Sequence, residues 1–239
     1  ALVPRSTLAN VHPPLLMAYL AAAWKLFGFA VPVTRVAMLV VGAATLTVTF
    51  LLGRRLAGGR VGLAAGALLA VSPPFVAQSL LAHLDLAATF WTLLTLYWFL
   101  DRRWWLAGAA ATALTLTKET GVLVPLVLAV LARREGRRLL PLGLPLVALG
   151  CWLVYVRSVT GYWLGNAEFE RYNVGEALAL GRIPLVFLRR LYQLGVANFH
   201  WIAAAALAAR WRRAKGGQAW RPVVAVLSAY VALHSVFGG

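Results

Sequence analysis

The sequence is poor in acidic residues and almost free of cysteine. Only 7 of its 239 residues are Asp or Glu, against 23 Lys or Arg, and cysteine occurs once, as Cys151. A single cysteine cannot form a disulfide within the chain or a cysteine-based metal site. The sequence also lacks the GxGxxG, P-loop, HExxH and GxSxG patterns, so no motif in it predicts nucleotide binding, zinc protease or serine hydrolase chemistry.

Apolar residues dominate what is present. They make up 62% of the chain, and the mean hydropathy is +0.78. A soluble domain could not bury this much apolar surface, so the composition predicts an integral membrane protein. A net charge of +16 would usually indicate nucleic acid, but the basic residues lie between apolar runs, as the positive-inside rule predicts for cytoplasmic loops. We therefore expect membrane lipids as partners and no nucleic acid.

The basic clusters, taken as cytoplasmic, divide the chain into about eight membrane segments. The fold expected is all-α, a polytopic transmembrane helix bundle. The predicted segments are 12–27, 33–53, 61–80 with a kink at 72–74, 86–100, an out-and-back path over 104–132, 139–156, about 190–209 and 222–237. Residues 158–183 are predicted to form an outer loop. We expect a single domain over residues 1–239 that is truncated at both ends, because the chain has no initiator Met and its last segment is cut off at Gly239. The Arg-, Ala- and Leu-rich composition favours a high-GC prokaryote, and so the bacterial inner membrane.

Helix lengths predict that two polar turns lie inside the membrane. At 1.5 Å per residue, residues 104–117 reach about 21 Å and residues 86–100 about 22 Å, less than a hydrocarbon core of roughly 30 Å. Asp85 and the turn at Lys118-Glu119 therefore lie below the outer surface. Charged groups persist at that depth in a water-filled cavity or buried against protein. We predict a crevice that is open to the outer side of the membrane.

The acidic candidates each have a structural alternative. Asp85 follows His83 and either caps the helix expected to begin at Leu86 or supplies a carboxylate to a site in the crevice. Lys118 and Glu119 either neutralise each other at the turn, or Lys118 meets an anionic ligand.

The remaining candidates lie nearer the N-terminus. His12 precedes Pro13-Pro14, which is also an ordinary signal for a helix start. Arg35 either reaches lipid headgroups or joins the site.

Several short motifs together resemble a known group of membrane enzymes. In order along the chain they are His12-Pro13-Pro14-Leu15, Trp24-Lys25-Leu26-Phe27-Gly28, Arg35, Ser72-Pro73, Leu84-Asp85-Leu86, Leu116-Thr117-Lys118-Glu119 and Pro125. Their order and spacing, over roughly residues 10–135, resemble the protein mannosyltransferase and aminoarabinose transferase group of GT-C membrane glycosyltransferases, the family 39-like group. Each motif is short, and the specificity comes from their occurrence in order.

The resemblance implies a function. Such enzymes take a hexosyl or pentosyl group from a polyprenyl-phosphate donor at the outer face of the membrane. They transfer it with inversion to a hydroxyl of a protein, lipid or glycan of the cell envelope. By the same resemblance, His12 and Lys118 contact the donor phosphate. Asp85 matches the family's second conserved acid, a catalytic residue beside the donor phosphate or a divalent metal ion.

The match departs from the family in two places. The family's first catalytic acid lies upstream of the HPPL-like motif, so we expect residues 1–239 alone to be inactive. Many members follow the lysine with glycine, whereas this chain has Glu119-Thr120, which leaves Glu119 as an unassigned candidate. His83 and Arg35 are further candidates for the site.

Two other classes of function remain open at this point. A secondary transporter also buries polar groups in the membrane, but it usually has paired broken helices in two repeats, and no internal repeat is found in this sequence. A non-catalytic scaffold subunit related to the enzymes would not depend on Asp85 or Lys118.

Overall fold

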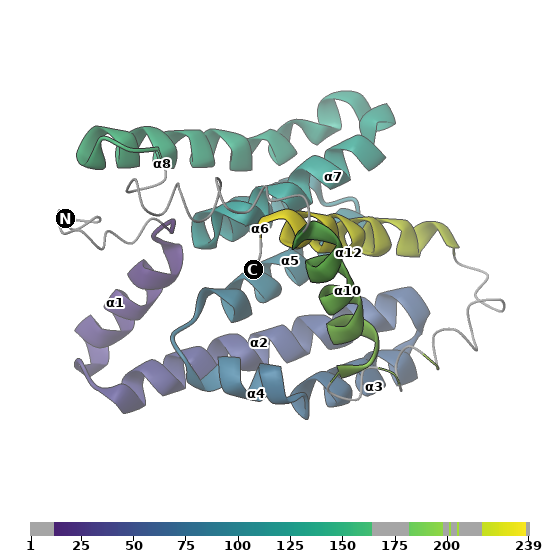
Figure 1. Ribbon diagram of the computed structural model, residues 1–239, viewed down its shortest axis with the longest axis horizontal. Helices are drawn as coiled ribbons and strands as arrows, with labels where there is room; N and C mark the ends of the chain where they lie inside the picture. The colour runs from purple at the N-terminus through teal and green to yellow at the C-terminus, as the bar shows by residue number, and fades with distance from the viewer. Residues whose placement is uncertain (1–11, 164–181, 198–200, 202–204, 206–216, 238–239) are drawn as a thin grey trace. The chain divides into compact units, whose positions relative to one another are not determined.

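The computed structural model describes residues 12–163, 182–197, 201, 205 and 217–237, and every regular element within them is a helix (Figure 1). The expected all-α fold is therefore confirmed. The chain divides into two compact units, His12–Trp152 and a second that consists mainly of Leu153–Gly239. Each unit is described by itself, and the single domain expected over residues 1–239 stays a prediction.

The first unit contains most of the helices. They are α1 (Leu15–Phe27), α2 (Val31–Ala57), α3 (Gly59–Ala70), α4 (Pro73–Leu80), α5 (Leu84–Leu100), α6 (Trp104–Thr117), the 3₁₀ helix η1 (Glu119–Val122), α7 (Leu123–Leu131), the 3₁₀ helix η2 (Arg133–Gly143) and the first part of α8 (Leu144–Thr160). Proline marks two of the starts, because Pro14 directly precedes α1 and Pro73 begins α4.

Helices α3 and α4 form a bent pair with an angle of 65° between them. The break falls at Ser72, whose backbone is extended because the following Pro73 disfavours the helical conformation there. The predicted kink at residues 72–74 is thus confirmed.

Three helical stretches among the described residues are long and apolar enough to cross a membrane, namely Val31–Ala57, Arg133–Thr160 and Ala219–Val236. The bent pair makes a fourth if it counts as one span. Shorter apolar helices cover Leu15–Phe27, Leu84–Leu100 and Glu119–Leu131. The total of about eight crossings stays a prediction.

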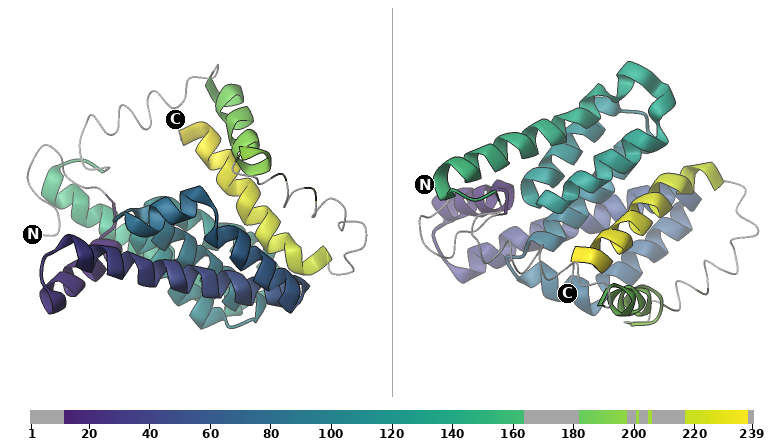
Figure 2. Two further views of the ribbon diagram at one scale, coloured as in Figure 1. Left: turned by 90° about the horizontal axis from the view of Figure 1, so that it is seen from below. Right: turned by 45° about the horizontal axis from the view of Figure 1, so that its top comes forward.

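Helix α2 packs against α3 and α5, and α5 packs in turn against α6 (Figures 1 and 2). The contact of α2 with α3 is close enough to require glycine. A Cβ on Gly62 would lie 2.5 Å from the backbone oxygen of Phe50 and 2.7 Å from the backbone nitrogen of Arg54. Backbone atoms cannot move aside as a flexible side chain can, so only glycine permits this approach.

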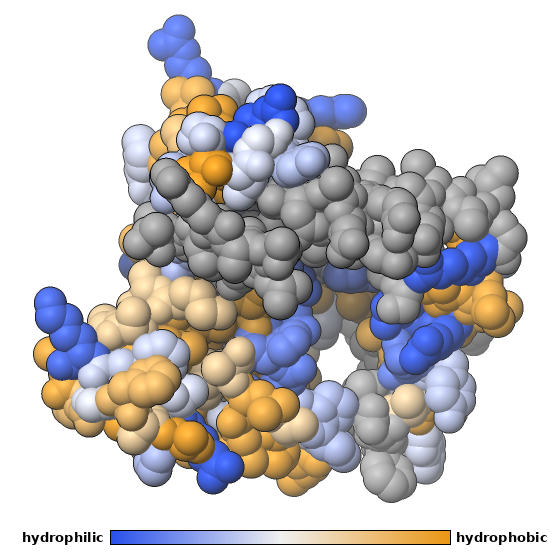
Figure 3. Space-filling model, turned by 60° about the vertical axis from the view of Figure 1, so that its left-hand side comes forward, coloured by the Kyte–Doolittle hydropathy of each residue, from blue (hydrophilic) through white to orange (hydrophobic). Residues whose placement is uncertain are grey.

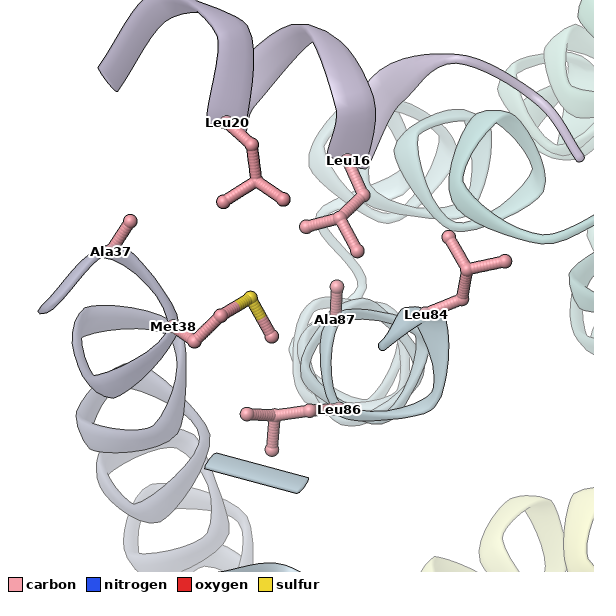
Figure 4. Close-up of a cluster of buried hydrophobic side chains, with 7 residues drawn as sticks. All are labelled: Leu16, Leu20, Ala37, Met38, Leu84, Leu86 and Ala87. Atoms are coloured by element: carbon pink, nitrogen blue, oxygen red, sulfur yellow. The ribbon is translucent and has the colours of Figure 1, made fainter. Parts of the chain in front are cut away.

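A buried apolar cluster joins the first turns of α1 and α5 to the N-terminal third of α2 (Figure 4). Its members are Leu16, Leu20, Ala37, Met38, Leu84, Leu86 and Ala87. Two of them, Leu84 and Leu86, flank Asp85 in the sequence. Their burial fixes the backbone on both sides of that carboxylate.

Large apolar side chains also reach the surface, as the orange areas of Figure 3 show. Phe29 is 83% exposed, Phe27 76% and Trp105 71%. Such a surface is unfavourable in water and suits lipid hydrocarbon. Together with the long apolar helices, it identifies the chain as an integral membrane protein.

The second unit contains α10 (Arg182–Gly195), which packs against α12 (Gly217–Phe237). The predicted segment 222–237 lies within α12. The segment predicted at about 190–209 begins earlier, at Arg182, because Pro184 fits the first turn of a helix. Most of its second half lies outside the described residues, as do residues 164–181 of the predicted outer loop.

Candidate functional site

The chain reverses direction after α6. Lys118 ends that helix in an extended conformation, with φ −148° and ψ 126°, and the backbone N–H of Gly121 donates to the carbonyl oxygen of Lys118 at 2.9 Å. Arg102, just before α6, forms an ion pair with Glu135, just after α7. Both ends of the segment therefore lie together, and the predicted out-and-back path over residues 104–132 is confirmed.

This turn brings three distant parts of the chain into contact. Lys118 Nζ lies 2.6 Å from Asp85 Oδ1, and His12 Nδ1 lies 2.9 Å from Glu119 Oε2. His83 Nδ1 lies 3.1 Å from Asp85 Oδ2. We call these five residues the polar cluster. All five were candidates from the sequence, whereas their pairing across up to 107 positions had no sequence signal.

Two adjacent residues of the turn have opposite charges and different partners. Successive side chains of extended backbone point in opposite directions, so Lys118 reaches the start of α5 while Glu119 reaches the segment before α1. The alternative in which Lys118 and Glu119 neutralise each other is thus not the arrangement observed.

The cluster is partly open to its surroundings. The side chain of Lys118 is 23% exposed, Glu119 27%, His12 32% and Asp85 44%. A ligand can therefore reach these groups, while burial of Leu84 and Leu86 in the apolar cluster holds the backbone of Asp85 in place. The crevice that the helix lengths predict stays a prediction.

The sequence reasoning gave Gly121 no role of its own, although this residue sets the position of the turn. A Cβ at this residue would lie 2.6 Å from Cγ of Leu114, a side chain that is fully buried in α6. The glycine therefore allows η1 to lie directly on α6. Its place three residues after Lys118, the charged residue at the end of α6, is the sequence signal that could have predicted a role for Gly121 in the turn.

The start of α5 corrects one prediction. The helix begins at Leu84, two residues before the expected start, and His83 occupies the N-cap position. Asp85 lies inside the first turn, so the alternative in which Asp85 is the N-cap residue is wrong. A carboxylate is favoured in the first turn by the positive end of the helix dipole.

Arg35 is not part of the polar cluster. It lies in the first turns of α2, its side chain is exposed, and it forms no hydrogen bond or ion pair with any described residue. Its role in the site therefore stays an unsupported prediction.

The basic clusters lie at the opposite ends of the same helices. Arg55 Nε contacts Asp101 Oδ1 at 3.0 Å just beyond α5, and Arg102 pairs with Glu135. These contacts gather three basic groups, Arg54-Arg55, Arg102-Arg103 and the arginines of η2, at what we call the basic end. Because α5 has 17 residues, about 25 Å separates this end from the polar cluster.

The described residues do not supply a complete ligand set for a metal ion. No group of three or more His, Cys, Asp or Glu side chains among them is placed to hold one. Asp85 contacts His83 and the ammonium group of Lys118, and an ammonium group is not a metal ligand. The divalent ion expected beside Asp85 stays a prediction, and no chemical step is derived through it.

Comparison with models of known protein families identifies the family of the chain. A profile of the family described as dolichyl-phosphate-mannose-protein mannosyltransferase matches residues 11–163. No curated protein and no solved structure matches the chain. The matched region covers more than half of the chain and contains all five residues of the polar cluster. The family implies a polyprenyl-phosphate-linked sugar as donor and an acceptor for that sugar. The chain therefore belongs to the dolichyl-phosphate-mannose-protein mannosyltransferase family and is a membrane glycosyltransferase of the mannosyltransferase type.

Proposed function

We propose that the protein transfers a sugar from a polyprenyl-phosphate donor to an acceptor hydroxyl on the outer face of the membrane, with inversion at the anomeric carbon. The observation that supports this most directly is the polar cluster itself. The hairpin turn places Lys118 and His12 close to two carboxylates, at the end of the helices farthest from the basic end. The acceptor is a protein, a lipid or a glycan.

The reaction needs a cation beside the leaving group. The acceptor oxygen attacks the anomeric carbon, the bond from that carbon to the phosphate oxygen breaks, and polyprenyl phosphate leaves with the electron pair while the hydroxyl proton passes to a base. Lys118 stabilises the charge that develops on the leaving oxygen, and His12 binds the same phosphate. Preorganised charges of this kind contribute several kcal/mol to transition states.

Asp85 is the proposed catalytic carboxylate. Its contact with Lys118 at 2.6 Å orients the ammonium group beside the donor phosphate. At 44% exposure the carboxylate also remains accessible to the bound substrates. His83, which contacts the other carboxylate oxygen, holds Asp85 in this orientation.

The outer-face assignment follows from charge. If the basic end is cytoplasmic, as the positive-inside rule predicts, about 25 Å of α5 carries Asp85 most of the way across a hydrocarbon core of roughly 30 Å. The cluster then lies just below the outer interface, where a lipid-linked phosphate and a water-exposed acceptor can meet. The Arg-, Ala- and Leu-rich composition supports the assignment of the protein to the bacterial inner membrane. Inactivity of residues 1–239 on their own stays a prediction.

Lipid binding gives the first test. The full-length protein is extracted gently from membranes and analysed by native mass spectrometry, with Lys118→Ala and His12→Ala beside the wild type. Lys25→Ala, an exposed lysine in the last turn of α1, is the matched control. We expect an adduct with the mass of a polyprenyl phosphate, with or without its sugar, that weakens in both site variants and persists in the control. An adduct that is absent, or indifferent to both changes, would contradict the donor assignment.

Sugar transfer separates an enzyme from a scaffold. Asp85→Asn should abolish transfer while the protein still inserts into the membrane. Asp101→Asn, which removes a carboxylate from the basic end, should leave transfer intact. Equal activity of the two variants would favour the scaffold, and ion- or proton-driven uptake by the wild type would favour a transporter.

A further inference from the structure

Each candidate phosphate ligand of the polar cluster already contacts a carboxylate. Lys118 pairs with Asp85, and His12 pairs with Glu119. A donor phosphate is itself an anion, so the charge of Glu119 opposes its binding. A carboxylate at this position must therefore have another use, or it weakens the site.

We propose that Glu119 is a resident counter-anion of His12, which the donor phosphate displaces when it binds. This inference rests on the proposed function, because it requires that His12 contacts the phosphate. In the empty site Glu119 holds the imidazole through Nδ1 at 2.9 Å. In the loaded site the phosphate takes the place of the carboxylate.

The geometry favours exchange at this pair rather than at Lys118. The contact of Lys118 with Asp85 is shorter, 2.6 Å against 2.9 Å for His12 with Glu119. His12 and Glu119 are 32% and 27% exposed, and ion pairs that water can reach are held weakly. Glu119 is also the first residue of η1, and the backbone bond from Gly121 to Lys118 keeps the turn closed when the carboxylate moves away.

The exchange would also assist release of the product. The donor is a phosphodiester with one negative charge, whereas the polyprenyl phosphate left after transfer is a monoester with up to two. Repulsion from Glu119 is therefore stronger for the product than for the donor. Return of the carboxylate to His12 restores the empty site for the next cycle.

The test measures binding of farnesyl phosphate to the full-length protein, with uncharged farnesol as the probe for the apolar chain alone. We expect Glu119→Gln to bind farnesyl phosphate about tenfold more tightly than the wild type, as for removal of one nearby like charge at a partly exposed site. Glu119→Ala should give a gain in the same direction, and farnesol binding should not change. Glu135→Gln removes a carboxylate at the basic end and should have no effect.

A double-mutant cycle assigns the effect to His12. In a His12→Ala background, Glu119→Gln should give a smaller gain, because repulsion of the phosphate remains while competition for His12 is gone. A gain of the same size as in the wild-type background would contradict the pairing. Wild-type affinity in both Glu119 variants would overturn the inference alone, whereas a wild type that does not prefer farnesyl phosphate to farnesol would overturn the proposed function as well.

Discussion

Replacement of Gly121 by alanine should damage the site without touching any charged group. The added Cβ would lie 2.6 Å from Leu114 Cγ, 3.0 Å from Leu114 Cδ1 and 3.1 Å from the Leu114 carbonyl oxygen. Leu114 is fully buried, and Cγ is the branch point of its side chain, so it cannot swing aside. The turn must move instead, and overpacking of this kind costs about 1–3 kcal/mol of folding stability.

The displacement should reach Lys118, whose carbonyl oxygen is bonded to the backbone N–H of Gly121. A misplacement of about 1 Å in a positioned group can cost on the order of 100-fold in rate. We therefore expect a lower melting temperature in detergent. We also expect kcat for sugar transfer to fall by about 10- to 100-fold. The assays are thermal unfolding of the purified protein and initial rates of transfer from the lipid-linked donor.

Two further variants make this prediction refutable. Gly150→Ala is the control, because a Cβ there meets nothing within 4 Å and glycine inside a helix is less stable than alanine by about 1 kcal/mol. In Leu114→Ala the obstructing branch is gone, so adding Gly121→Ala should cost less than it does in the wild type. The reasoning fails if Gly121→Ala melts and turns over like Gly150→Ala.

Three other variants separate chemistry, packing and surface charge. Lys118→Ala should lower the transfer rate by about 100- to 1000-fold with little change in melting temperature, and an unchanged rate would exclude it from donor binding. Met38→Ala, at a fully buried position of the apolar cluster, should lower the free energy of unfolding by about 2–5 kcal/mol, measured by thermal unfolding. A smaller loss than in Leu63→Ala, at an exposed position, would contradict the packing of this cluster. Arg102→Ala removes a partly exposed ion pair with Glu135 and a contact of the guanidinium with the Trp104 ring, so stability should fall by only about 1 kcal/mol and transfer should persist, which initial rates will check.

Local signals in the sequence were sufficient where one segment decides the structure. The start of α1 follows Pro13-Pro14, and the bend between α3 and α4 occurs at Ser72. The distribution of basic residues correctly predicted that the chain reverses direction at Lys118, because the basic groups on both sides of residues 104–132 were expected on the same side of the membrane.

The pairing inside the site could not be predicted in the same way. Contact between His12 and Glu119 depends on the packing of α1 and α6, and no residue spacing records it. The first turn of α5 was misplaced by two residues because Leu84 and Leu86 are equally apolar, and burial of both in one cluster decides where the helix begins. Arg35 was a candidate from its motif alone, and the fold leaves it outside the cluster.

The extended backbone at Lys118 makes the site sensitive to the register of the chain. Because adjacent side chains point in opposite directions there, loss of a single residue from the end of α6 would shift Glu119 toward Asp85 and remove the cation from its place. Two carboxylates would then face each other, and the charge that faces Asp85 would change sign although the charged residues stay the same. We therefore expect this turn to tolerate substitutions far better than insertions or deletions.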